Sequence, residues 1–152
     1  MNFVEIEFGS PLYQQELNLR HEILRRPLGM DLFASDLSGE PGYRHFGLVR
    51  DGQLMACVMV VPVEEGLVRF KQMAVRDELQ GKGWGRFLIS EVERVVRTDG
   101  ALRVTLNARL SAVEFYHKLG YHGVGEGFTE VTIAHLRMEK DLRSREEREP
   151  DQ

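Results

Sequence analysis

The chain has 152 residues and a formal net charge of −4 at pH 7, and its length corresponds to about one domain. Acidic and basic residues are interspersed along the chain. This pattern excludes a dedicated nucleic-acid-binding protein, which would carry a basic excess or stripe. The single cysteine, Cys57, excludes an internal disulfide framework and is typical of a cytoplasmic protein. The longest apolar run, residues 54–63, falls far short of the ~20 residues of a membrane-spanning helix, so no membrane partner is expected.

Alternating apolar residues predict a first strand over residues 2–8. Ser10 and Pro11 are typical of the N-cap and first position of a helix. Helical spacing then continues until Pro27 and Gly29 end it. Residues 29–42 are rich in Gly, Pro, Ser and Asp and predict a loop longer than an ordinary connector, which is often functional.

The middle of the chain predicts an antiparallel meander followed by a helix. Residues 43–50 and 53–63 read as two strands joined by Asp51-Gly52, a two-residue hairpin turn. A third strand is predicted over residues 67–76. Apolar residues at helical spacing predict a helix from Trp84 to Gly100.

The last third of the chain predicts a strand at residues 102–106 and a short helix that ends at Gly120. Ser111 and Glu114 have the spacing of a capping box at the start of this helix. A final hairpin is expected over residues 121–140, with its bend near Glu126-Gly127. About seven strands and four helices, with the strands mostly consecutive, predict an α+β fold with a mixed, largely antiparallel sheet.

The domain is predicted to comprise residues 1–140, followed by a charged tail at 141–152. From Arg143 onward this tail carries no large apolar residue, and we expect it to be disordered.

A glycine-rich segment follows the third strand of the meander and opens the next helix. Gly81, Gly83 and Gly85 allow positive φ angles and a close approach of a ligand to the backbone. Successive amides and the helix N-terminus can then converge on an anion, and Lys82 and Arg86 add full positive charges. These features predict a bound phosphate or diphosphate.

Two common nucleotide-binding motifs do not fit this segment. The Walker motif requires Ser or Thr after its lysine, whereas Gly83 follows Lys82. The Rossmann motif requires a third glycine where Arg86 stands, and a parallel strand pair instead of a meander.

The pattern Gln80-x-x-Gly83-x-Gly85 resembles the acyl-CoA loop of the GCN5-related N-acetyltransferase (GNAT) superfamily. A second match lies about 25 residues further on, where Asn107 precedes a helix with Phe115-Tyr116 that ends in Leu119-Gly120-Tyr121. Within the superfamily, the chain resembles the small bacterial group that includes ElaA and YjcF. Residues 128–140 match the C-terminal signature of that group, and His45 matches a histidine position. One departure is Thr132-Ile133-Ala134-His135, where Gly-Ile-Pro-His is expected.

The resemblance implies an N-acetyltransferase that uses acetyl-CoA as donor and has the GNAT fold. No metal is expected, because the five histidines show no metal-ligand spacing with a cysteine or carboxylate partner. It implies that the diphosphate binds to the backbone of a loop and the pantetheine arm to the adjoining strand and to a neighbouring asparagine. The implied donor-binding residues are Met73, Ala74, Val75, Gln80, Gly81, Lys82, Gly83, Trp84, Gly85, Arg86 and Asn107.

The resemblance also suggests the catalytic side chains. Tyr116 is the candidate general acid for the leaving thiolate, because a phenol stays protonated at neutral pH; the alternative is a packed core tyrosine. His45 and His135 are candidates for the base that accepts the amine proton, and the alternative for each is a histidine satisfied by local hydrogen bonds.

Two classes of function stay open from the sequence. The first is an enzyme that acetylates a small-molecule or peptide amine. The second is an acyl-CoA sensor that retains the loop without turnover. We also expect that an exposed strand edge could pair two copies of the chain as a homodimer.

Overall fold

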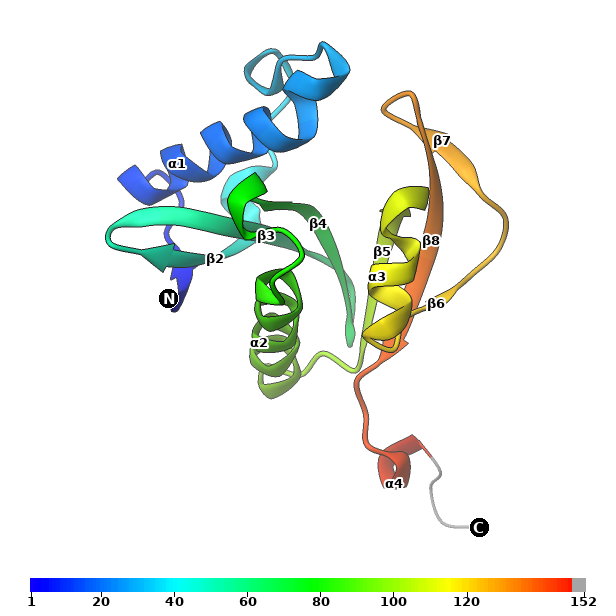
Figure 1. Ribbon diagram of the computed structural model, residues 1–152. Coiled ribbons are helices and arrows are strands. Elements are labelled where there is room, and N and C mark those ends of the chain that lie inside the picture. Colours follow the sequence, from blue (N-terminus) through cyan, green and yellow to red (C-terminus); the bar gives the residue numbers. More distant parts are fainter. Residues whose placement is uncertain (149–152) are drawn as a thin grey trace. The chain divides into compact units, whose positions relative to one another are not determined.

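The computed structural model describes residues 1–148, which form eight strands and four α-helices. The chain divides into two compact units. The first unit comprises Met1–Val61 and Phe70–Arg94, and the second comprises Pro62–Arg69 and the residues from Val95 onward. Figure 1 labels most elements of both units.

The first unit is built on consecutive strands in the order β1 (Asn2–Ile6), β2 (Arg44–Arg50), β3 (Gln53–Glu64) and β4 (Leu67–Val75). The pairs β1–β2 and β2–β3 are antiparallel. The turn between β2 and β3 has φ 52° at Asp51 and 77° at Gly52, and a two-residue hairpin turn of this kind needs positive φ at both positions. The hairpin predicted from the sequence is therefore confirmed.

Helix α1 (Pro11–Arg20) begins as predicted, because the Ser10 hydroxyl accepts a hydrogen bond from the Tyr13 amide at 3.1 Å and proline occupies the first helical turn. The α-helical pattern ends earlier than expected. Residues His21–Arg25 form a π-helical turn, and Arg26–Leu28 form a 3-10 turn. Pro27 explains the change, since its ring has no N–H and clashes with the carbonyl four residues before it.

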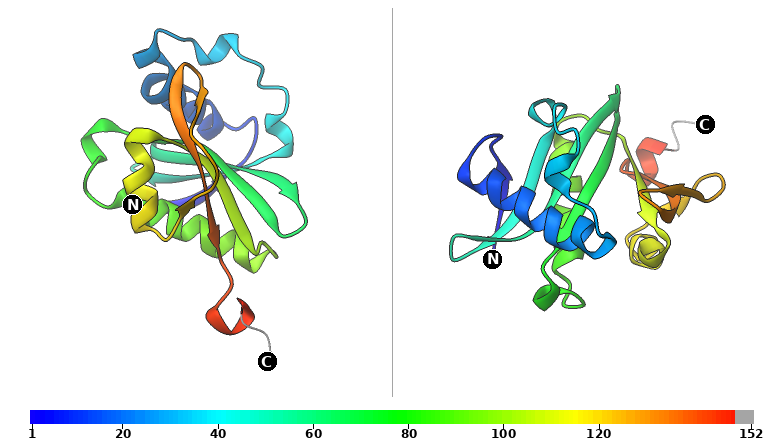
Figure 2. Two further views of the ribbon diagram at one scale, coloured as in Figure 1. Left: turned by 90° about the vertical axis from the view of Figure 1, so that its right-hand side faces the viewer. Right: turned by 90° about the horizontal axis from the view of Figure 1, so that it is seen from above.

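The predicted loop after this helix contains two short 3-10 turns, Leu32–Ala34 and Glu40–Gly42. Helix α2 (Trp84–Thr98) follows β4 and a 3-10 turn at Asp77–Leu79. Helices α1 and α2 lie on opposite faces of β2 and β3, as the views in Figures 1 and 2 agree. The core under α1 consists of apolar side chains from the helix, the strands and the loop: Ile6, Tyr13, Leu17, Leu19, Leu32, Leu54, Cys57 and Ala74.

The second unit contains β5 (Arg103–Arg109), α3 (Val113–Lys118), β6 (His122–Gly123), β7 (Phe128–Glu130), β8 (Ile133–Asp141) and α4 (Arg145–Arg148). Strand β8 pairs antiparallel with β5, β6 and β7. Gly120 ends α3 as predicted, with φ 97°. The amides of Gly120 and Tyr121 donate to the carbonyls of His117 and Tyr116, which closes the last turn of the helix.

Two local predictions in the second unit are wrong. Ser111 does not cap α3: it lies inside a 3-10 turn, and Ala112 is the N-cap without a side-chain hydrogen bond. The bend of the last hairpin is formed by Val131 and Thr132, both at positive φ, and not by residues 126–127, which lie between β6 and β7. Neither bend residue belongs to the Gly, Asn and Asp types that favour positive φ, so the pattern favoured the wrong turn.

The charged tail differs in part from the prediction of disorder. Residues Arg145–Arg148 form the short helix α4, and Arg97 forms an ion pair with Glu147. Residues 149–152, which the same prediction included, lie outside the described part of the chain. Among residues 1–148, no helix is both long and apolar enough to cross a membrane.

Candidate active site

The predicted diphosphate loop begins directly where β4 ends. The Arg76 amide donates to the Met55 carbonyl at 3.0 Å, which ties the end of the strand to β3. The Gln80 side-chain amide then donates to the Val75 carbonyl at 3.0 Å and to Asp77 Oδ1 at 3.2 Å. Gln80 therefore fixes the start of the loop to the end of the strand through its side chain.

The glycines of this loop adopt the conformations that their residue type permits. Gly81 has φ 77° and Gly83 has φ 87°, in the region where an L-residue is strained by roughly 1–2 kcal/mol. A Cβ added at either position would meet open space, so the backbone angle and not crowding requires glycine. Lys82 and Arg86 are exposed beside them.

Helix α2 starts at Trp84, and its first intrahelical bond in this region runs from the Phe87 amide to the Gly83 carbonyl at 3.0 Å. The amides before Phe87 at the head of a 15-residue helix therefore point out of it. Backbone donors, a helix dipole and two cations are a donor set that suits a diphosphate. The loop thus fits the diphosphate of acetyl-CoA.

Strand β4 carries an irregularity that the sequence did not predict. Gln72 lies in the middle of the strand with φ 56°, a conformation that is rare for a residue other than glycine and that marks a local break in the ladder. Its side-chain oxygen accepts from Arg25 Nη2 at 3.3 Å. This break directly precedes the predicted pantetheine residues 73–75, of which Ala74 is buried while its two neighbours are half-buried.

A cavity of about 450 Å³ opens beside Gln72. Residues 35–40 of the long loop after α1 form much of its wall, together with side chains of α1, β3 and β4. The other lining residues are Arg20, Arg25, Leu32, Tyr43, Met59, Lys71 and Gln72. The loop that the sequence marked as functional therefore lines a hollow next to the irregular part of β4.

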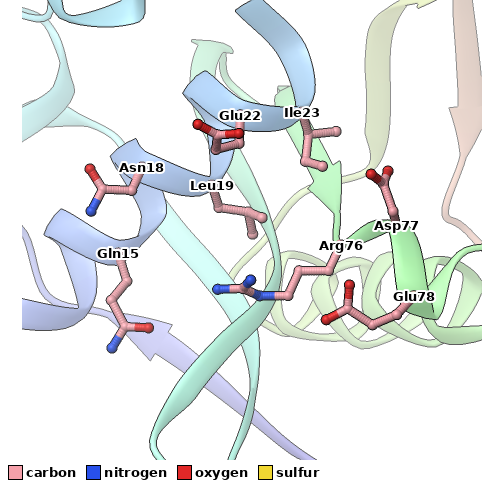
Figure 3. A pocket seen from close by; sticks show the side chains of 8 residues that line it. All are labelled: Gln15, Asn18, Leu19, Glu22, Ile23, Arg76, Asp77 and Glu78. Atoms are coloured by element: carbon pink, nitrogen blue, oxygen red, sulfur yellow. The ribbon is translucent and has the colours of Figure 1, made fainter. Parts of the chain in front are cut away.

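A second, smaller hollow of about 290 Å³ lies where α1 faces the residues that follow β4. Figure 3 shows Gln15, Asn18 and Glu22 on one side and Arg76 with two acidic neighbours on the other. Arg76 Nε donates to the Leu54 carbonyl at 2.8 Å, which holds its side chain in this hollow.

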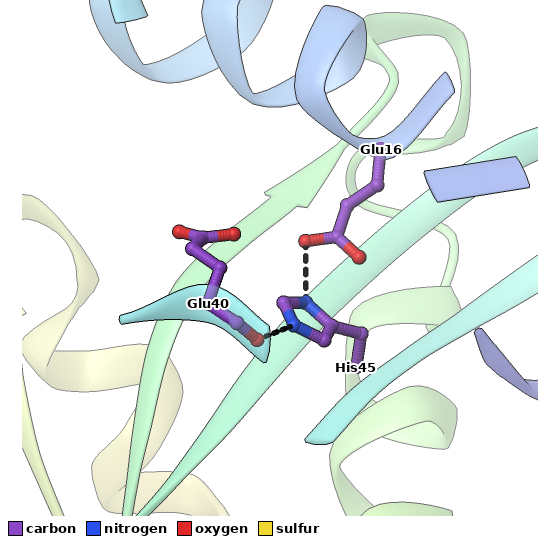
Figure 4. Close-up of side chains that lie close together, drawn as sticks. All are labelled: Glu16, Glu40 and His45. Carbon is purple, nitrogen blue, oxygen red and sulfur yellow. Dashed lines mark hydrogen bonds and ion pairs between the residues drawn. The ribbon is translucent and has the colours of Figure 1, made fainter. Parts of the chain in front are cut away.

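His45, one of the two predicted bases, lies fully buried in β2 with 1% of its surface exposed. Its Nδ1 is 2.9 Å from Glu16 Oε2, and its Nε2 is 3.0 Å from the backbone oxygen of Glu40 (Figure 4). Both ring nitrogens are therefore engaged in local hydrogen bonds. This geometry favours the alternative interpretation of His45.

His45 belongs to an ion-pair cluster that sequence reasoning missed, comprising Tyr13, Glu16, Arg20, Glu40 and His45. Arg20 donates from Nη1 to Glu16 Oε2 at 2.8 Å and forms a two-point contact with the Glu40 carboxylate at 2.8 and 2.7 Å. The Tyr13 hydroxyl donates to the same carboxylate at 2.7 Å. Only the i, i+4 spacing of Glu16 and Arg20 is a signal in the sequence.

Three members of the cluster, Glu16, Glu40 and His45, offer ligand-type atoms within 4.8 Å of one another. Arg20 contacts both carboxylates, and its guanidinium would repel a cation placed among them. We therefore describe the cluster as an ion-pair network and not as a metal centre.

The remaining predicted residues belong to the second unit. Tyr116 is buried in α3 and its ring contacts the rings of Phe115 and Tyr121, with centroids 5.0 and 5.6 Å apart. Burial raises the pKa of Tyr116, so that its phenol keeps its proton at neutral pH. Asn107 is half-buried in β5, opposite Arg137 of β8.

His135, the other predicted base, is 5% exposed in β8. Its Nδ1 lies 2.8 Å from the backbone oxygen of Ile133, and its Nε2 lies 3.8 Å from Glu130 Oε2. The Phe128 ring stacks on the imidazole with centroids 5.8 Å apart. The β7–β8 hairpin thus holds this histidine locally as well.

Comparison with known proteins identifies the family. A sequence profile described as "Acetyltransferase (GNAT) domain" matches residues 21–142, most of the chain. The chain therefore belongs to the GNAT family of N-acetyltransferases, as the two motifs predicted.

One sequence relative and two solved structures are similar to this chain over nearly its whole length. The uncharacterized N-acetyltransferase YitI of Bacillus subtilis (strain 168) is 29% identical over 146 residues, which cover 91% of this chain and 98% of YitI. The crystal structure of Escherichia coli ElaA superposes with a TM-score of 0.79 at 19% identity, over 92% of this chain and 99% of that one. An aminoglycoside 6'-N-acetyltransferase solved with coenzyme A superposes with a TM-score of 0.78 at 18% identity, over 99% and 100%. The predicted fold class, an α+β acyl-CoA N-acyltransferase fold, is therefore confirmed.

Proposed function

We propose that the protein transfers an acetyl group from acetyl-CoA to a primary amine of a small molecule or peptide. The observation that carries the proposal is the loop Gln80–Arg86, where two open glycines at positive φ lead into the exposed amides of a long helix. Membership of the GNAT family supports it, as does a structural relative that was solved with coenzyme A.

In this proposal the chain holds the donor by backbone groups. The amides of the loop bind the diphosphate, with Lys82 and Arg86 beside them, and residues 73–75 and Asn107 bind the pantetheine arm. The break at Gln72 alters the direction of the adjoining amides, and an amide aimed at a thioester oxygen stabilises the charge that develops there by ~3–4 kcal/mol. The donor supplies an activated acyl group as its thioester.

In this reaction the amine attacks the thioester of acetyl-CoA directly, and no covalent intermediate forms with the enzyme. The amine nitrogen forms a bond to the thioester carbon, and the bond from that carbon to sulfur breaks. The proton lost by the amine passes to a base or a water molecule, since an alkylammonium has a pKa near ~10. Tyr116 donates a proton to the departing thiolate.

The acceptor is proposed to enter the cavity of about 450 Å³ beside Gln72. Residues 35–40 would then determine which amines are accepted, because they form much of its wall. The proposal is tested by measuring CoA release from acetyl-CoA with a panel of amines that includes spermidine, kanamycin and L-lysine ethyl ester, together with calorimetry of CoA binding. Absence of CoA binding would overturn it.

The acid role of Tyr116 has its own test. Tyr116→Phe removes only the hydroxyl, and loss of a general acid lowers kcat by roughly 10²-fold or more. Tyr121→Phe is the matched control, because Tyr121 is also buried and its ring packs against that of Tyr116. Full turnover in the first variant would contradict the assignment.

One observation favours a second candidate, an acyl-CoA sensor without turnover. Both predicted bases, His45 and His135, make local hydrogen bonds. No release of CoA thiol across a broad amine panel, with CoA binding retained, would favour the sensor.

Pairing of two copies through a strand edge remains a separate prediction, which size-exclusion chromatography with light scattering tests.

A further inference from the structure

The hydrogen-bond partners of His45 indicate its protonation state. One partner is the Glu16 carboxylate and the other is the backbone carbonyl of Glu40, and both groups only accept hydrogen bonds. A neutral imidazole carries a single N–H and could satisfy only one of them. A protonated Glu16 could instead donate to a neutral ring, but its Oε2 also accepts from the Arg20 guanidinium at 2.8 Å, a charge-assisted contact of the kind that a carboxylate makes. With Glu16 as a carboxylate, both ring nitrogens donate, as they do in an imidazolium.

The charges of the cluster also favour a protonated His45. Glu16 and Glu40 contribute two negative charges, and Arg20 contributes one positive charge. A second positive charge on His45 makes the cluster neutral, whereas a neutral ring would leave one uncompensated charge in a buried site, which is costly.

The other titratable groups near the cluster do not change this balance. Burial raises the pKa of Tyr13 and that of Cys57, so both stay uncharged at neutral pH. The residues opposite His45 on the neighbouring strands are Ile6 and Met59, which carry no charge.

The cluster ties three parts of the first unit together. Glu16 and Arg20 belong to α1, His45 belongs to β2, and Glu40 belongs to the 3-10 turn at the end of the segment that lines the cavity beside Gln72. Arg20 holds the side chain of Glu40, and His45 holds its backbone. Removing the imidazole N–H at Nε2 would release the backbone contact.

We propose that His45 is a buried imidazolium that positions residues 35–40, the wall of the acceptor cavity, and is not the catalytic base. The proposal rests on the assignment of that cavity to the acceptor. It makes His45 a determinant of acceptor binding through Glu40, without contact to the reacting atoms.

The pKa of His45 sets the pH range of this role. Burial alone would lower it, but the hydrogen bond and the attraction of Glu16, with the contribution of Glu40, outweigh burial and raise it above 6.5. Because the folded-state pKa is raised, the stabilisation is fully present below the unfolded value near ~6.5. It is lost as pH rises through the pKa of the folded state.

The first experiment is nitrogen NMR of the full chain with labelled histidine, which reports the protonation of each ring. We expect both ring nitrogens of His45 to be protonated at pH 7 and to titrate above the ordinary histidine pKa of ~6.5. A neutral His45 ring at pH 7 would overturn the proposal. This readout needs no substrate, so it is independent of acetyl transfer.

The second experiment is amide hydrogen exchange. In His45→Gln the amides of residues 35–40 and Gly42 should exchange roughly tenfold faster, as expected from loss of one hydrogen bond to a charged network. The control His122→Gln, at an exposed position of β6, should match the unchanged protein. Equal protection in both variants would overturn the proposal. If His45→Gln does not fold, the same amides of the unchanged protein should lose protection as pH rises through the NMR midpoint, and constant protection would overturn it.

The third experiment separates a positioning residue from a base. With acetyl-CoA and whichever amine of the panel is turned over, His45→Gln should raise KM for the amine about tenfold, corresponding to one lost charged hydrogen bond. Its kcat and its KM for acetyl-CoA should change less than threefold. A fall of roughly 10²-fold or more in kcat would indicate a base instead. If no amine is turned over, the proposed function fails, while NMR and exchange still decide the role of His45.

Discussion

The loop Gln80–Arg86 and the ion-pair cluster around His45 belong to the same unit and are built in opposite ways. The loop is one exposed, contiguous segment, and the groups it offers to a ligand are mainly backbone amides. The cluster is buried, and its side chains come from α1, β2 and the turn before β2. Under the proposed function, donor recognition depends on local backbone conformation, whereas the shape of the candidate acceptor cavity depends on paired charges in the core.

The largest expected effect is a loss of unfolding free energy when the buried ion-pair cluster is broken. Arg20→Met leaves two buried carboxylates without their main partner, and breaking a buried ion pair costs about 3–5 kcal/mol of unfolding free energy. Urea denaturation measures the loss. The control is Arg26→Met, which breaks a surface i, i+4 pair with Glu22 whose partners are 70% and 53% exposed and should cost less than about 0.5 kcal/mol. Similar costs for both variants would mean that the cluster contributes no more than a surface pair.

A smaller effect is expected at the edge of the same cluster. Tyr13→Phe removes the hydroxyl that donates to the Glu40 carboxylate at 2.7 Å, and a hydrogen bond to a charged group contributes about 1.5–3 kcal/mol to stability. A double-mutant cycle with Glu40→Gln isolates the coupling between the two residues. Additive free energies of unfolding would show that Tyr13 acts only through packing.

The smallest effect on stability, but a specific effect on binding, is expected in the loop. Gly83→Ala places a Cβ on a residue with φ 87°, and an L-residue is strained there by roughly 1–2 kcal/mol. We expect the Kd for CoA, measured by calorimetry, to rise about tenfold as the loop relaxes. Gly42→Ala is the control, because Gly42 also faces open space but is not at positive φ. Equal CoA affinity in both variants would show that the positive φ angle at Gly83 is not needed for donor binding.

Local patterns predicted much of the fold. The β2–β3 hairpin followed from Asp51-Gly52, the start of α1 from Ser10-Pro11, and the end of α3 from Gly120, because each depends on residues adjacent in the chain. The predictions were wrong where the chain adopts a local structure other than the one that its sequence pattern favours. Ser111 and Glu114 have capping-box spacing, but the chain forms a 3-10 turn there instead. The bend at Val131-Thr132 uses residues with no intrinsic preference for positive φ.

In the candidate site too, features of short segments were predicted from the sequence, whereas contacts between distant residues were not. Family membership followed from two spaced motifs. The candidate donor loop stays a prediction, and its glycine conformation and helix N-terminus could be anticipated because both are properties of short segments. The partners of His45 could not be predicted, since Glu16 and Glu40 lie 29 and five residues away along the chain. The break in β4 at Gln72 also left no signal, because glutamine does not favour positive φ.

The sequence by itself determined the α+β fold class, the GNAT family and the segment that suits an acyl-CoA diphosphate, since these depend on periodicity, turn residues and contiguous motifs. Only the tertiary structure decided that His45 is enclosed between two acceptors and linked to Arg20 and the wall of a cavity. The physical reason is that burial and charge pairing depend on which distant side chains the fold brings within hydrogen-bond distance, and no local pattern encodes that distance.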